Sequence, residues 1–274
     1  MSQSKDAANL FRDFLDALNR RDWDAMSEKI GPGVLREGET VATSLFLNEL
    51  KTQAGALSDA TSKIHTLVVG EAAAKVAAIV LHSGSSGGRK TEWAEFVFCG
   101  FENGTFEEYT NLKDHETVGV LRSVASGASV PDQVSNQASD VDLGAVYLQY
   151  IDAINTQTMA KHFPKYCQPL VVHNGRDLSM DEYRGFIESS LAEVEGLYFD
   201  VVGLVVDDKA QRVAARIELT GRPVKEFLGM QPTGRDIKFM EHVFYEFREG
   251  KIARVWSALD LAAVKACLEP PDEP

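Results

Sequence analysis

Two side chains near the end of the sequence could together move protons. Asp260 follows an apolar run that contains Trp256, and His242 lies in the apolar run before it. A carboxylate in a dry pocket has its pKa raised by desolvation, so it can act as a base near neutral pH and, once protonated, as an acid. An imidazole beside it could orient the carboxylate or share its proton. The pair predicts acid/base chemistry with Asp260 and His242 as catalytic residues.

Each residue also has a structural interpretation. Asp260 could be an acid at the end of a strand that accepts a hydrogen bond from a nearby backbone amide. His242 could face away from a cavity, since a shift of one residue in strand register would reverse its direction. Symmetric pairing about Glu249-Gly250 places His242 opposite Ala258, one step from Asp260 on the same face. That register favours the catalytic interpretation.

Both side chains are expected on a long β-hairpin. The runs 237–247 and 252–259 are rich in β-branched and aromatic residues, and Glu249-Gly250 supplies the turn between them. The same hairpin occurs at 88–114, where an offset of 146 residues aligns the copies without a gap. Offsets of 137 and 136 align the strands and the first helix upstream. The order of matches over the whole length indicates an internal duplication.

The duplication provides a comparison for the candidate site. Asp114 corresponds to Asp260, but Phe96 stands where the second copy has His242, and Thr110 replaces an aromatic residue. The first copy thus keeps the acid without its polar partner. This difference predicts that the second copy holds the working cavity and that the first copy is degenerate.

The other elements follow from periodicity and breakers. In the first copy we expect helices over 7–20, 22–30 and 43–57, with a short strand at 34–36 before the third helix and strands at 62–69 and 75–82 after it. In the second copy we expect helices over 143–155, 158–166 and 179–195 and strands at 169–173, 198–206 and 211–220. Helices followed by antiparallel strands are an α+β pattern.

Composition fits two globular domains. The chain has 274 residues, of which 44% are hydrophobic and 25% charged, which allows about two cores of ordinary size. The small, polar run 127–141 predicts a linker between a domain at 1–126 and another at 142–274. A net charge of −13 argues against binding nucleic acid or an anionic membrane surface. Three scattered cysteines and the lack of a signal-peptide pattern favour a cytoplasmic protein.

A lengthened loop in the second copy is expected to cover a cavity. It spans 221–234, where the first copy has only a short run of glycine and serine. His173 could reach the mouth of the cavity or lie on a surface turn, and Tyr183 could donate a hydrogen bond to a substrate oxygen. The predicted substrate-binding residues are Trp256, His173, Tyr183, Phe227, Met230 and Phe239.

The second copy resembles the SnoaL-like polyketide cyclases of the NTF2-like superfamily. The resemblance covers nearly all of 143–268 and is carried by His173-Asn174-Gly175, Glu226-Phe227-Leu228-Gly229, Pro232-Thr233-Gly234-Arg235, Glu249-Gly250-Lys251-Ile252, Trp256 and Asp260. Gly221-Arg222-Pro223 departs from the family's usual Gly-Thr-His, which removes a familiar polar contact. The resemblance implies Asp260 as the family's acid/base carboxylate.

The same resemblance implies a fold. Each copy would be a cone, in which a curved antiparallel sheet wraps around N-terminal helices and encloses a deep apolar cavity. Two tandem NTF2-like cones of this α+β class are expected to pair within the chain as a pseudo-dimer, with further homo-oligomerisation left open.

The expected function is that of a polyketide-type cyclase that needs no cofactor and no metal. It would close an aldol or lactone ring in a small hydrophobic, enolisable intermediate of secondary metabolism. Two alternatives remain open at this point. One is an epoxide hydrolase or isomerase of the same superfamily, for which Asp260 with Arg216 or Arg235 is the visible candidate site. The other is a non-catalytic module that binds a small molecule.

Overall fold

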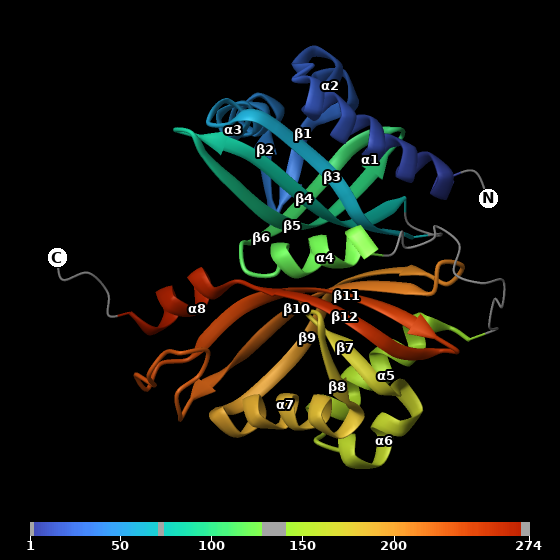
Figure 1. Cartoon of the computed structure of the whole chain (residues 1–274), viewed down its shortest axis with the longest axis vertical. Coiled ribbons are helices and arrows are strands. Elements are labelled where there is room, and N and C mark those ends of the chain that lie inside the picture. Colours follow the sequence, from blue (N-terminus) through green and yellow to red (C-terminus); the bar gives the residue numbers. More distant parts are fainter. Residues whose placement is uncertain (1–2, 71–73, 128–140, 270–274) are drawn as a thin grey trace. The chain divides into compact units, whose positions relative to one another are not determined.

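The computed structural model of the chain describes residues 3–70, 74–127 and 141–269. These residues form two compact units that divide near residue 130 (Figure 1). Apart from its first and last residues, the predicted linker 127–141 lies outside the described residues. In the described ranges, no helix is both long enough and apolar enough to span a membrane.

The first unit begins with helices and continues into a sheet. Its elements are α1 (Gln3–Arg20), α2 (Trp23–Lys29), β1 (Ile30–Arg36), β2 (Glu39–Ala42), α3 (Thr43–Gly55), β3 (Ser58–Val69), β4 (Lys75–Ser86), β5 (Arg89–Glu102), β6 (Thr105–Asp114) and α4 (Val118–Gly127). The strands form one six-stranded sheet in the order β2-β1-β6-β5-β4-β3. Helices α1, α2 and α3 cover one face of this sheet (Figure 1).

The second unit repeats this plan. Its elements are α5 (Leu143–Asn155), α6 (Met159–Tyr166), β7 (Cys167–His173), β8 (Arg176–Ser179), α7 (Met180–Glu193), β9 (Val194–Asp207), β10 (Arg212–Pro223), β11 (Ile237–Arg248), β12 (Lys251–Leu259) and α8 (Leu261–Leu268). The strand order β8-β7-β12-β11-β10-β9 is that of the first sheet, strand for strand. The predicted pair of tandem α+β cones is therefore confirmed.

The sheets differ from the expected ones in one pairing each. β1 runs parallel to β6, and β7 runs parallel to β12, so the sheets are mixed instead of purely antiparallel. A parallel pair requires a long connection between its strands, and here the intervening helix and meander provide it. The short strands β2 and β8 and the closing helices α4 and α8 were not among the expected elements.

The hairpin of β11 and β12 follows its predicted register. His242 pairs with Ala258, and Phe244 pairs with Trp256. The turn residues have positive φ, at 52° for Glu249 and 71° for Gly250. Two successive positive φ values match the right-handed twist of a two-residue hairpin turn, which explains the tight reversal at this position.

Aromatic rings fill the core of the first unit. Phe106 of β6 stacks on Phe14 of α1, with ring centroids 4.7 Å apart. Its other ring neighbours are Phe46 at 6.1 Å, Phe101 at 5.3 Å and Tyr109 at 5.8 Å. The ring of Phe106 thus joins α1 and α3 to the sheet.

Candidate functional site

Helix packing decides which face of the second sheet is interior. Tyr147 of α5 contacts Tyr245 of β11 with ring centroids 5.0 Å apart. Because side chains alternate along a strand, Glu241 and Val243 share that helix-covered face, and His242 lies on the opposite one.

Trp256 pairs with Phe244 and so lies on the same outer face as His242. The predicted register is confirmed, but the face assigned to His242 and Trp256 was wrong. A cavity beneath the helices would not be lined by either residue.

Asp260 begins α8 as its N-cap. Its Oδ1 accepts a hydrogen bond from the Ala263 amide at 2.9 Å. Asp114 lies further from α4, which begins at Val118, and its Oδ1 accepts from the amides of Glu116 at 2.7 Å and Thr117 at 3.2 Å. Local backbone contacts thus explain why both copies keep this acid, and they favour the structural interpretation of Asp260, while its catalytic role stays a prediction.

A substitution series at Asp260 tests the cap. Asp260→Ala is expected to lower the free energy of unfolding by about 1 kcal/mol, and Asp260→Asn to change it little, because asparagine caps a helix as well as aspartate does. Both variants should keep turnover within a few-fold of the parent protein. Urea denaturation and steady-state rates check this. A stable Asp260→Asn protein that loses most of its turnover would restore the catalytic assignment.

Glu241 is the carboxylate that the second sheet presents to the helices. It is half-buried, and the Ser257 hydroxyl donates a hydrogen bond to its Oε1 at 2.5 Å. Burial raises the pKa of Glu241, and the hydrogen bond from Ser257 opposes that effect only in part. A carboxyl group with a raised pKa is suited to taking and returning protons near neutral pH.

Sequence reasoning missed Glu241, although a signal was present. At the offset of 146, Glu241 aligns with Glu95, and both acids interrupt apolar strands. A glutamate at the same position of an apolar strand in both copies is a candidate functional residue.

A cluster of tyrosines lies near Glu241. The hydroxyls of Tyr150 and Tyr183 are 2.7 Å apart. Burial raises the pKa of Tyr183 and of Tyr147, and the charge of Glu241 adds to the rise in both cases. These hydroxyls therefore keep their protons and can donate hydrogen bonds. The predicted role of Tyr183, as a hydrogen-bond donor to a substrate oxygen, is compatible with this geometry.

His173 joins the same cluster from β7. Its ring centroid lies 5.9 Å from that of Tyr183 and 5.2 Å from that of Phe186. Burial, and then the charge of Arg176, lower the pKa of His173 to about 4. The imidazole is therefore neutral at physiological pH. The structure brings together His173 and Tyr183, two of the predicted substrate-binding residues.

The low pKa of His173 predicts a pH-dependent stability. Above 6.5, the ordinary pKa of histidine, the neutral His173 makes its full contribution to the stability of the fold. That contribution falls as the pH drops towards about 4, because the unfolded chain takes up a proton more readily than the folded protein does. We expect a loss of about 1–2 kcal/mol across this window for a half-buried ring. Urea denaturation at the two ends of the window should show a smaller loss in His173→Phe. An equal loss in both proteins would contradict the assignment.

The long loop of the second unit folds back on itself. Phe227 and Met230 exchange backbone hydrogen bonds at 3.0 and 2.9 Å. Phe227 is buried, with its ring centroid 6.2 Å from that of Phe239. Phe239 precedes Glu241 by two residues on the same strand, so the loop packs on the interior side of the sheet, and Met230 is half-buried beside it.

Comparison with known proteins agrees with this architecture. The family model of the SnoaL-like polyketide cyclases matches residues 144–268. A crystal structure of a SnoaL-like polyketide cyclase from Agrobacterium tumefaciens is 36% identical, covering 46% of this chain and 98% of that one, with a TM-score of 0.44. TsrD from Streptomyces laurentii is 20% identical, covering 50% of this chain and 98% of its own, with a TM-score of 0.42. A search of curated proteins finds no match.

Two findings define the class of this protein: the match to the family model, and the 36% sequence identity to the Agrobacterium tumefaciens relative, of which 98% is covered. The chain belongs to the SnoaL-like polyketide cyclase family. Its two units are tandem NTF2-like domains.

Proposed function

We propose that the second unit is a cyclase that works by acid/base catalysis without a cofactor, with Glu241 as its proton-transfer group. The observation that carries this proposal is a half-buried carboxyl group with a raised pKa among protonated tyrosines. The substrate class is a small polyketide-type molecule with a methylene between two carbonyl groups. Protons on such a carbon are acidic enough for a carboxylate base.

The proposed step balances its protons. The Glu241 carboxylate takes a proton from the methylene carbon, and the resulting enolate attacks a second carbonyl within the same molecule. The protonated Glu241 then returns this proton to the new alkoxide, either directly or through the Tyr183 hydroxyl, which gives up its own proton and takes the one held by Glu241. Tyr150 orients the Tyr183 hydroxyl through their 2.7 Å hydrogen bond.

The geometry favours this reaction over epoxide hydrolysis at the sites first considered. Arg216 pairs with His242 across β10 and β11, on the face opposite Glu241. Asp260 uses a carboxylate oxygen to cap α8. A carboxylate oxygen held by a backbone amide is a weaker candidate for activating a water, so the site at Asp260 is the less favoured one.

Product analysis tests the proposal. The purified protein is incubated with linear 3,5-diketo thioesters of increasing chain length, and products are identified by mass spectrometry and NMR. A cyclised product that depends on Glu241 supports the proposal. Binding without turnover, or diol formation from epoxides but no ring closure, would overturn it in favour of a binding module or a hydrolase.

A further inference from the structure

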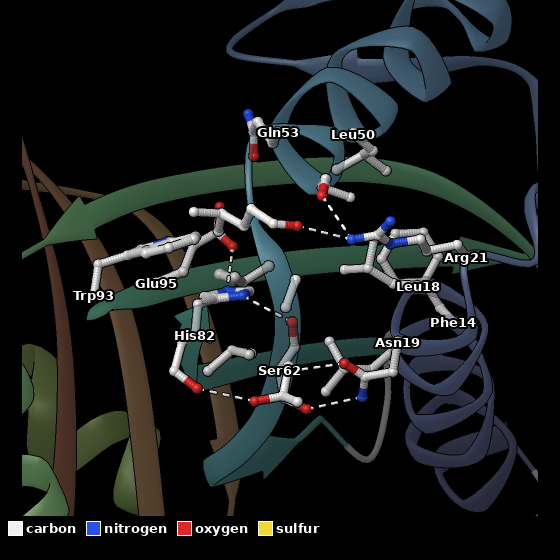
Figure 2. A pocket seen from close by; sticks show the side chains of 18 of the residues that line it. Phe14, Leu18, Asn19, Arg21, Leu50, Gln53, Ser62, His82, Trp93 and Glu95 are labelled. Carbon is white, nitrogen blue, oxygen red and sulfur yellow. Dashed lines mark hydrogen bonds and ion pairs between the residues drawn. The ribbon is translucent and has the colours of Figure 1, made fainter. Parts of the chain in front are cut away.

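The first unit contains a pocket of its own. It lies between α1, α3 and the sheet, with Phe14, Leu18 and Leu50 among its apolar walls. Figure 2 shows Arg21 and Asn19 on one side of this space, and Trp93, Glu95 and His82 on the other. The pocket thus has apolar walls and polar groups on two opposite sides.

One polar end holds a buried acid–base pair. His82 Nε2 lies 2.9 Å from Glu95 Oε2, and each of the two side chains is only 9% exposed. The other ring nitrogen, Nδ1, lies 2.9 Å from the Ser62 hydroxyl. Trp93 stacks on the imidazole at 4.9 Å with an interplanar angle of 11°.

The carboxylate of the pair stays ionised. Burial alone would raise the pKa of Glu95, but His82 outweighs burial and lowers it. Asn111 also donates a hydrogen bond to the same carboxylate. The pair therefore places an ionised carboxylate and an imidazole at the wall of an apolar pocket.

The fold does not require this pair. At the offset of 137, His82 aligns with Leu219, so the second unit builds the same strand without the histidine. Replacing a buried ion pair by apolar side chains is often neutral or stabilising, so such a pair is weak evidence for a structural role. Buried charged groups in a cleft instead indicate a functional site.

The other polar end is a cation without an acidic partner. Arg21 Nη2 donates to the carbonyls of Ala54 at 3.0 Å and Leu57 at 2.9 Å, which fixes the guanidinium at the pocket. Within the described part of the chain, no carboxylate forms an ion pair with Arg21. The chain has a net charge of −13, so a cation that makes no ion pair is unusual in it. A guanidinium held in a fixed orientation can bind an anion.

We propose that this pocket is a second ligand site, which binds a small organic acid with an apolar body and a carbonyl group. The carboxylate of the ligand pairs with Arg21, and its apolar body lies between Phe14, Leu18 and Leu50. Its carbonyl group reaches the His82–Glu95 end, where the indole N–H of Trp93, which stacks on His82, supplies a donor. This site is separate from the one at Glu241, and the proposal does not depend on the cyclase assignment.

The sequence comparison missed this site because it examined the wrong face. Phe96 and Thr110 made the first copy look degenerate, but Phe96 lies between Glu95 and Val97, which line the pocket. It therefore points to the other side of β5. The difference between the copies at positions 96 and 242 carries no information about this pocket.

Calorimetric titration with three probes tests the proposal. 6-Oxoheptanoate has a carboxylate and a ketone at opposite ends of an apolar chain, heptanoate lacks the ketone, and 2-heptanone lacks the carboxylate. 6-Oxoheptanoate should bind the parent protein roughly tenfold or more tightly than either of the others, since each lost polar contact costs about that much. Equal binding of all three, or no binding of 6-oxoheptanoate, would overturn the proposal.

The duplication supplies matched variants. Arg21 aligns with Gln157 at the offset of 136, and both have positive φ, at 56° and 54°. Arg21→Gln and His82→Leu thus import residues that the second unit already accommodates. Arg21→Gln should remove the preference for 6-oxoheptanoate over 2-heptanone, and His82→Leu the preference over heptanoate.

Glu241→Gln is the control that shows in which unit the ligand binds. It should leave the affinity for 6-oxoheptanoate unchanged, whatever its effect on ring closure, so the two proposals fail separately. Weaker binding in Glu241→Gln, with full binding in Arg21→Gln and His82→Leu, would place the ligand in the second unit and overturn the inference. Circular dichroism confirms that each variant is folded, and should Arg21→Gln fail to fold, His82→Leu still decides.

Discussion

Replacing Glu241 by glutamine is expected to lower the rate of ring closure by roughly 10²–10⁴-fold, the usual loss for an acid/base group. Glutamine has nearly the same shape and can still accept the hydrogen bond from Ser257, so the fold should survive. It cannot take a proton. The defect should therefore appear in kcat far more than in the binding of substrate.

The pH profile provides a second measurement of the same assignment. A general base must be deprotonated, so the rate should fall as pH drops through the pKa of Glu241. Burial raises that pKa, so the fall should begin at a higher pH than for an ordinary carboxyl group. This limb of the profile should be absent in Glu241→Gln.

His242→Phe is the matched control for Glu241→Gln. It imports Phe96 from the aligned position of the first unit, and His242 lies on the sheet face opposite Glu241. Activity and pH profile should stay close to those of the parent protein. Full activity in Glu241→Gln together with a large loss in His242→Phe would return the catalytic role to the histidine.

Truncating Phe106 to alanine should be among the most destabilising single changes in the first unit. Phe106 is 1% exposed and contacts four other aromatic rings, so its removal leaves a cavity between α1, α3 and the sheet. Loss of a buried phenylalanine side chain costs about 3–5 kcal/mol. Hydrogen exchange of the amides in β4 and β5 should report a loss of this size.

Leu45→Ala is the control for Phe106→Ala. Leu45 lies in the same unit on α3 but is 58% exposed. Exposed positions away from special features usually change stability by no more than about 0.5 kcal/mol. Comparable losses from the two changes would show that the aromatic cluster is not the core of this unit.

Several features of this protein could be predicted from local sequence. The duplication follows from matched order along the chain, and the hairpin register follows from Glu249-Gly250, since a two-residue turn fixes which residues face each other. The cap at the start of α8 was one of two interpretations left open for Asp260. Each of these features depends on residues that are close together in the sequence, or on the similarity between the two copies.

The charged groups of the first pocket depend on distant contacts. His82 and Glu95 lie on adjacent strands, and Arg21 reaches the pocket from the end of α1. Nothing in the spacing of these residues indicates that they converge. Their convergence follows from the curvature of the sheet and from the helices packed against it.

The sequence by itself determined the two copies, the α+β class of each, and which residues of β11 and β12 are paired. It could not determine which side of that hairpin is interior. Val243 and Tyr245 alternate with His242 and Phe244, so both faces of β11 are rich in large apolar or aromatic side chains, and alternation alone cannot rank them. Only the packing of Tyr147 of α5 on Tyr245 chooses the face that the helices cover, and that choice turns Glu241 towards the helices and His242, which is also buried, to the opposite face.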